Sequence, residues 1–232
     1  NFKKYDATEL PPALIGEVSF YNTGTILTST IKKENRFISP STLEKTSNDF
    51  HISKLDFDQP RLQTNNLPKN MYATIGTAIH NAFAAWRIEK ITADRIIAIS
   101  NLTQRMQLNG YINEAELDKS FEGFWNYIQT KFAPTNIIRE LPLIEVTPDN
   151  GLITNGIADL IVETKDGLIL IDHKTFPGDF ETQVLVKGNE YYAGKYAPQL
   201  NMYKQLLEKA TGKKVIAMLL HYVVQGKIVE VF

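Results

Sequence analysis

The stretch from residue 156 to residue 179 constrains the fold of this chain more than any other. It reads GIADLIVETKDGLILIDHKTFPGD, two runs of Ile, Leu and Val on either side of Asp166–Gly167. Such runs around an Asp–Gly turn predict the two antiparallel strands of a hairpin. Asp159, Asp172 and Lys174 interrupt the apolar pattern, and a buried sheet holds charged groups only where they have partners.

A two-residue turn at Asp166–Gly167 pairs Asp159 with Lys174 across the hairpin. Side chains alternate between the two faces of a strand, so this register puts Asp159, Asp172 and Lys174 on one face. Neighbours across the strands have Cβ atoms about 5 Å apart, and diagonal neighbours about 7–8 Å apart. The other face is predicted to be core and consists of Ala158, Leu160, Val162, Ile169 and Ile171.

Two carboxylates at that separation can share a hard divalent cation such as Mg²⁺, which prefers oxygen ligands. A protonated lysine beside them cannot bind the metal, but it can position a water or offset charge on a phosphate. The triplet therefore indicates phosphodiester hydrolysis. The alternative is a structural ion pair between Asp159 and Lys174 with a solvated Asp172, and the triplet alone does not separate the two interpretations.

Composition excludes several other classes of site and partner. The chain has no cysteine, which excludes disulfides, zinc–thiolate sites and iron–sulfur clusters. The formal net charge is −1, so any polyanion must be held by a local patch or by metal ions. No apolar run approaches the roughly 18 residues of a membrane span. We expect a protein of the cytoplasm with no membrane partner.

The pattern along the chain predicts an extension or linker over residues 1–38 and one domain over residues 39–232. Ser39 or Ser41, with Glu44, is typical of a helix start. Residues 51–70 are polar, contain two prolines and predict a loop. Helical periodicity then covers residues 72–131, and the remainder predicts the order β-β-β-α-β-β, with the helix beginning near Ala197 and ending at Gly212.

Two helices carry further candidate residues. Gly76 and His80 lie four residues apart in the first, and Gln199 and Tyr203 lie four residues apart in the second, so each pair shares a helix face. A mid-helix glycine costs about 1 kcal/mol relative to alanine, so Gly76 predicts a close approach of another segment. Taken singly, His80 can be a structural or surface histidine, and Gln199 and Tyr203 can be ordinary polar helix residues.

In this order, the stretches GTAIH (76–80), GIAD (156–159), IDHKT (171–175) and QLNMY (199–203) resemble the successive motifs of the RecB-like nucleases of the PD-(D/E)XK superfamily. SPSTLE at 39–44 is similar to the segment that often opens such domains. The resemblance covers roughly residues 38 to 232. It implies an α/β (α+β) fold with a restriction-endonuclease-like core, in which helices flank a mixed β-sheet and the N-terminal part is helical.

The resemblance also implies a role for each matching residue. His80, Asp159 and Asp172 would bind Mg²⁺ or Mn²⁺, with the backbone carbonyl of His173 as a further ligand. Asp159, Asp172, Lys174 and Gln199 would form the catalytic set, and Gln199 and Tyr203 would contact the DNA strand. Glu140 stands where many members carry an acidic or polar residue on the first strand, and its alternative is a solvated residue at a strand start.

One position departs from the family pattern, because the residue between the second acid and the lysine is often aromatic and here is His173. The predicted register points this side chain into the core, away from the metals, so a structural role is the better interpretation. Some relatives also hold an iron–sulfur cluster, which a chain without cysteine cannot form.

The function implied by the resemblance is a divalent-metal-dependent DNA nuclease, with exonuclease action expected. Domains of this kind stand at the C-terminus of RecB- and AddA-type helicase–nucleases that act in double-strand break repair and recombination. The implied partners are DNA and a helicase region of the same polypeptide, or a partner helicase or nuclease subunit. The missing initiator Met and the irregular first 38 residues lead us to expect an excised C-terminal domain.

Two alternatives come from other classes. The first is a catalytically silent DNA-binding or scaffolding module of a helicase complex, against which the joint presence of His80, Asp159, Asp172, Lys174 and Gln199 argues. The second is a small-molecule metallohydrolase, for which no nucleotide or sugar pocket is indicated. Several lysines of the C-terminal half could give a local phosphate-binding surface, or an ordinary solvated face.

Overall fold

The structure, a computed structural model, describes residues 37–40, 50–64, 68–146, 152–185 and 192–232, which fall within one unit, Arg36–Phe232. Most of the predicted linker (1–38), the helix expected to follow Ser41 and the turn expected at 149–151 lie outside the described residues. The division of the chain at residue 38 stays a prediction.

Three helices occupy the segment in which helical periodicity was predicted. They are α2 (Tyr72–Ala85), α3 (Thr92–Arg105) and α4 (Glu114–Phe132), and a short 3-10 turn, η3 (Lys69–Met71), precedes them. Asn113 caps α4 by accepting hydrogen bonds from the backbone N–H groups of the first turn. No helix of the described part combines the length and the apolar character that a membrane crossing needs.

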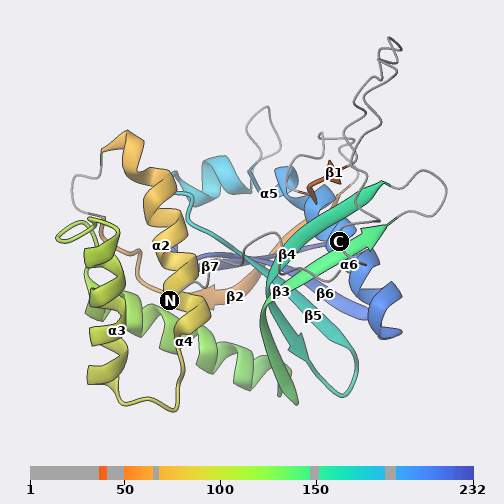
Figure 1. Cartoon of the computed structure of the whole chain (residues 1–232), viewed down its shortest axis with the longest axis horizontal. Helices are drawn as coiled ribbons and strands as arrows, with labels where there is room; N and C mark the ends of the chain where they lie inside the picture. The colour runs from red at the N-terminus through yellow and green to blue at the C-terminus, as the bar shows by residue number, and fades with distance from the viewer. Residues whose placement is uncertain (1–36, 41–49, 65–67, 147–151, 186–191) are drawn as a thin grey trace, which may run out of the picture. The chain divides into compact units, whose positions relative to one another are not determined.

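The described residues form a seven-stranded sheet with the order β1-β4-β5-β6-β7-β2, in which β3 pairs with β4. Its strands are β1 (Phe37–Ile38), β2 (Ile52–Asp58), β3 (Asn136–Val146), β4 (Ile153–Glu163), β5 (Leu168–Lys174), β6 (Val215–Tyr222) and β7 (Lys227–Val231). Between β5 and β6 lie the π turn η4 (Phe180–Val184), α5 (Tyr192–Lys195) and α6 (Ala197–Thr211). The predicted mixed sheet flanked by helices, and thus the α/β fold class, is confirmed (Figure 1).

The loop predicted for residues 51–70 is partly wrong, because β2 lies within it. This strand pairs antiparallel with β7 at one end of the strand order. Phe57 is its one buried residue among the seven, and Leu55 packs only partly against the core. An edge strand with so little apolar content gives a weak sequence signal.

Helices cover both faces of the sheet (Figure 1). One core cluster joins α2, α3 and α4 to one face and contains Phe83, Phe121 and Phe124. A second cluster joins α6 to the other face and contains Leu200 and Leu207. Burying such a side chain contributes about 1.5–3 kcal/mol. The central strand β5, six of whose seven residues are buried, is held by apolar contacts on both sides.

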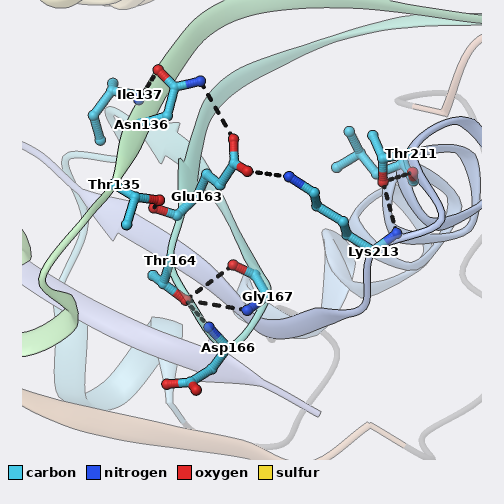
Figure 2. A network of polar contacts seen from close by, with 10 residues as sticks. Thr135, Asn136, Ile137, Glu163, Thr164, Asp166, Gly167, Thr211 and Lys213 are labelled. Carbon is cyan, nitrogen blue, oxygen red and sulfur yellow. Dashed lines mark hydrogen bonds and ion pairs between the residues drawn. The ribbon is translucent and has the colours of Figure 1, made fainter.

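The predicted register of the hairpin is wrong by two residues. Glu163 pairs with Leu168 and Ile161 with Leu170, so the loop has four residues and not two. Thr164 sets this loop, because its hydroxyl oxygen accepts hydrogen bonds at 3.2 Å from the backbone N–H groups of Asp166 and Gly167 (Figure 2). Extending this register places Asp172, and not Lys174, across from Asp159.

A polar network holds this end of the hairpin to the rest of the fold (Figure 2). The Glu163 carboxylate forms an ion pair with Lys213, which follows α6, and accepts a hydrogen bond from the Asn136 amide at the start of β3. The β4–β5 hairpin is therefore tied at its closed end to both neighbouring segments, and its other end carries the charged residues.

The alternation of side chains is interrupted near Asp159. On β4, Leu160 packs into the cluster of α2 to α4, whereas Ala158 packs into the cluster of α6. The prediction that these two residues share a core face is therefore wrong. Glu140 lies between the residues of β3 that pair with Leu160 and Ala158, and its φ is +51°. A non-glycine residue in that region is uncommon and marks a local change in strand direction.

Candidate metal-dependent active site

Asp172 and Lys174 lie at the end of β5 and contact each other. The Lys174 Nζ atom is 2.5 Å from the Asp172 Oδ2 atom, and Asp172 is 2% exposed. The alternative interpretation, an Asp159–Lys174 ion pair with a solvated Asp172, is wrong on both points. The apolar run of β5 carries Asp172 into the interior, where a carboxylate requires partners.

The electrostatic state of this pair is unusual. Burial, together with the nearby charge of Asp159, raises the pKa of Asp172 to about 6 against the opposing effect of Lys174. Burial lowers the pKa of Lys174, but Asp172 more than offsets that effect and raises it overall. A buried carboxylate whose ionised form is disfavoured is an environment that a cation would relieve, and it is typical of functional sites.

Asp159 lies where β4 and β5 stop pairing, one residue beyond the Leu160–Ile171 pair. Its Oδ2 atom accepts a hydrogen bond of 2.8 Å from the backbone N–H of His173 and lies 3.4 Å from the Nδ1 atom of His80 on α2. Burial raises the pKa of Asp159, but the contacts with His80 and His173 outweigh burial and lower it. Asp159 is therefore ionised at neutral pH and directed toward α2.

The position of α2 depends on Gly76, one turn before His80. A Cβ atom built on Gly76 would lie 3.0 Å from the Thr175 Oγ1 atom, next to Lys174 in the chain. The predicted close approach at Gly76 is confirmed. Burial lowers the pKa of His80, but the contact with Asp159 and the charge of Asp172 raise it overall.

Glu140 joins His80 and Asp159 in one cluster. Each of the three offers a ligand atom, and these atoms lie within 4.8 Å of one another. Burial and the charge of Asp159 raise the pKa of Glu140. Sequence reasoning assigned little weight to this residue, because the positive φ that turns Glu140 away from a regular strand leaves no mark in the sequence pattern.

Gln199 and Tyr203 face the site from α6. The Gln199 Nε2 atom donates to the Asp172 Oδ1 atom at 3.0 Å and to the Tyr203 hydroxyl at 3.4 Å. Tyr203 is 4% exposed, and a Cβ atom on Gly156 would lie 2.5 Å from its ring. Gln199 thus fixes the orientation of Asp172. The expected contacts of Gln199 and Tyr203 with DNA stay predictions.

Tyr196 is a site residue that the sequence analysis missed. Its ring centroid lies 4.1 Å from the Lys174 Nζ atom, an arrangement in which the aromatic face attracts the ammonium. The signal that could have found Tyr196 is its spacing of three residues before Gln199, which puts both on one side of a helix start. Lys174 therefore lies between Tyr196 and Asp172.

His173 points into the core, as predicted. Its ring centroid lies 4.2 Å from that of Phe83, and its Nδ1 atom lies 3.0 Å from the Nδ1 atom of His221. Burial lowers the pKa of His173 to about 3 and that of His221 well below its ordinary value. The imidazole of His173 is a neutral core residue among aromatic rings, and only its backbone reaches the site.

The donor set fits a divalent metal. One imidazole nitrogen and two carboxylates gather in the His80 cluster, and the further carboxylate of Asp172 lies beside them with a disfavoured negative charge. Mg²⁺ takes oxygen ligands, and Mn²⁺ accepts both imidazole and carboxylate. The ligand set expected from the sequence was His80, Asp159 and Asp172, and the geometry adds Glu140 as a candidate.

Comparison with known proteins places this geometry in a family. A profile described as "PD-(D/E)XK nuclease superfamily" matches residues 42–230. A large ATP-dependent helicase/nuclease subunit from Lactobacillus helveticus is 28% identical over 181 residues, covering 68% of this chain and 14% of the relative. Its namesake from Listeria welshimeri is 24% identical over 189 residues, covering 74% of this chain and 15% of the relative.

The chain thus spans about one seventh of the length of these relatives. Among solved structures, the crystal structure of SSO0001 aligns with a TM-score of 0.30 and 15% identity, covering 67% of this chain and 72% of that one. That likeness is too distant to support an argument.

Proposed function

Because the chain belongs to the PD-(D/E)XK nuclease superfamily, we propose that it is a metal-dependent deoxyribonuclease domain that hydrolyses phosphodiester bonds. The observation that carries the proposal is the meeting of three potential ligands, from α2, β3 and β4, beside a buried carboxylate–lysine pair. We propose that His80, Asp159 and Asp172 bind the metal, with Glu140 as a further ligand.

A divalent ion held there, Mg²⁺ or Mn²⁺, would supply an activated water and stabilise the negative charge on the phosphoryl oxygens. The water oxygen attacks phosphorus, the bond to the leaving oxygen breaks, and that oxygen takes up a proton. Lys174 is the one ammonium that the described geometry brings beside the ligands, and it would orient the water or neutralise a phosphoryl oxygen. Gln199 and Tyr196 hold Asp172 and Lys174 in place for that role.

The wider setting is also part of the proposal. The relatives are named as helicase/nuclease subunits, and the chain matches only a short part of them. We infer that the domain acts as the exonuclease part of a helicase–nuclease in DNA repair and recombination in the cytoplasm. A helicase region of the same polypeptide, or of a partner subunit, would deliver the DNA. A catalytically silent DNA-binding module remains the second candidate, favoured only by the near-neutral charge of the chain.

Release of nucleotides from DNA tests the proposal. We expect the purified chain to degrade end-labelled linear DNA when Mg²⁺ or Mn²⁺ is added, and to stop when a chelator is added, because the carboxylates alone cannot activate water at neutral pH. Calorimetry with the same metals gives the second readout. Metal binding without cleavage of single- or double-stranded DNA would refute the nuclease. Absence of both would establish the silent module.

A further inference from the structure

Arg139 borders the candidate metal site and has an unusual environment. It precedes Glu140 on β3, and its guanidinium carbon lies 5.3 Å from the ring centroid of Trp125 on α4. Its Nε atom is buried and, among the described residues, has no hydrogen-bond partner. A buried donor without a partner costs free energy, so a partner from outside the chain would improve this environment.

A second arginine lies near the first. Arg87 follows α2, the helix that carries His80, and is exposed. Its Nη1 atom donates to the backbone carbonyls of Ala84 and Trp86 at 2.7 Å. Burial and the positive charge of Arg87 lower the pKa of Arg139, and the charge of Glu89 offsets only part of this. Within the described ranges neither arginine lies within 4.0 Å of a carboxylate oxygen.

The environment of the two arginines suits an anion. Two guanidinium groups repel each other unless a negative charge lies between them, and the planar fork of arginine matches two oxygens of a phosphate. Stacking on Trp125 keeps the Arg139 fork in one orientation, which reduces the entropy lost on binding.

The place of the two arginines in the fold indicates which phosphate they meet. Arg139 is next in sequence to Glu140, and Arg87 lies seven residues after His80 at the end of the same helix. Glu140 and His80 belong to the metal cluster. A phosphate held by the arginines would therefore be a neighbour of the phosphate at the metal.

We propose that Arg139 and Arg87 form a phosphate-binding subsite that holds an internal phosphodiester of the DNA strand beside the one being cleaved. This inference rests on the proposed nuclease function and extends it. The arginines position the strand and take no part in the chemical step. Their removal therefore weakens substrate binding and leaves the turnover of bound substrate largely unchanged.

Kinetics of Arg139→Gln and Arg87→Gln test the subsite. Each variant is expected to raise KM for DNA about tenfold with kcat changed less than about twofold, because a charge-assisted phosphate contact is lost. Each should also reduce the slope of log affinity against log salt by about 0.7–0.9. Arg105→Gln, which removes an exposed arginine from the last turn of α3, is the matched control and should change neither.

Substrates with one methylphosphonate, placed at successive positions from the cleaved bond, locate the contact. The parent should lose affinity at one internal position, and Arg139→Gln should be insensitive there, with or without a 5′-phosphate on the strand. Equal sensitivity of parent and variant would overturn the proposal and leave Arg139 a structural residue. An effect confined to strands with a 5′-phosphate would overturn it in favour of end recognition.

The test separates this inference from the nuclease proposal. If the parent does not cleave, the nuclease proposal fails, and the subsite is then decided by the salt slope and methylphosphonate scan of equilibrium binding. If the parent cleaves and the variants keep its KM and slope, only the subsite fails. Should Arg139→Gln not fold, the exposed Arg87→Gln variant carries the same test.

Discussion

Asp172→Asn is expected to reduce the rate of DNA cleavage by about 10³-fold or more, equal to roughly 4 kcal/mol of transition-state stabilisation. The substitution keeps the shape of the side chain, and its amide oxygen can still accept the hydrogen bond from Gln199. It removes the negative charge that would bind the metal and that pairs with Lys174. The rate is measured on linear DNA at saturating Mg²⁺ or Mn²⁺, with circular dichroism to establish that the variant is folded.

Asp166→Asn is the matched control, since it removes a carboxylate from the exposed loop of the same hairpin. We expect it to cut at the parental rate. A folded Asp172→Asn variant that cuts within tenfold of the parent would remove Asp172 from the site. The same comparison applied to Lys174→Met asks whether the ammonium is needed once the metal is bound.

Asp118→Ala is expected to reduce the free energy of unfolding by about 3–5 kcal/mol, the usual cost of leaving one member of a buried ion pair alone. Asp118 on α4 is 1% exposed and accepts hydrogen bonds of 2.8 and 3.0 Å from Arg95 on α3. It also accepts a bond of 2.7 Å from the indole N–H of Trp86, at the end of α2. One carboxylate thus joins α4 to α3 and to α2, the helix that carries His80.

Urea denaturation, followed by circular dichroism, measures this change. Asp94→Ala removes an exposed carboxylate from the first turn of α3 and should cost less than about 1 kcal/mol. A loss for Asp118→Ala that is no larger than the loss for Asp94→Ala would show that the helices are held together by apolar packing alone.

Much of the site could be predicted from the sequence because the main motifs lie in regular elements. His80, Gln199 and Tyr203 are placed by helical spacing, which tolerates an error of one residue at a helix end. The hairpin register was wrong, yet the error was two residues. A shift of two preserves which face a strand residue occupies, so Asp172 and Lys174 still share one end and one side of β5.

Other parts of the site could not be predicted because they depend on tertiary contacts. The four-residue loop is set by the Thr164 hydroxyl, which competes with the Asp–Gly turn that composition favours. The interruption at Glu140 and Asp159 breaks the period of two on which the hairpin argument rests. Tyr196 contacts Lys174 only because α6 packs against the face of β5 that carries Asp172.

The metal site itself is decided by diffraction at the manganese absorption edge from crystals soaked in Mn²⁺. We predict an anomalous peak about 2.0–2.4 Å from a His80 nitrogen and an Asp159 oxygen, with Asp172 or Glu140 completing the protein ligands. The same soak of the Asp172→Asn variant should weaken or abolish the peak. An empty site in the parent at millimolar Mn²⁺, or a peak bound without His80 and Asp159, would contradict the assignment of this cluster as the catalytic metal centre.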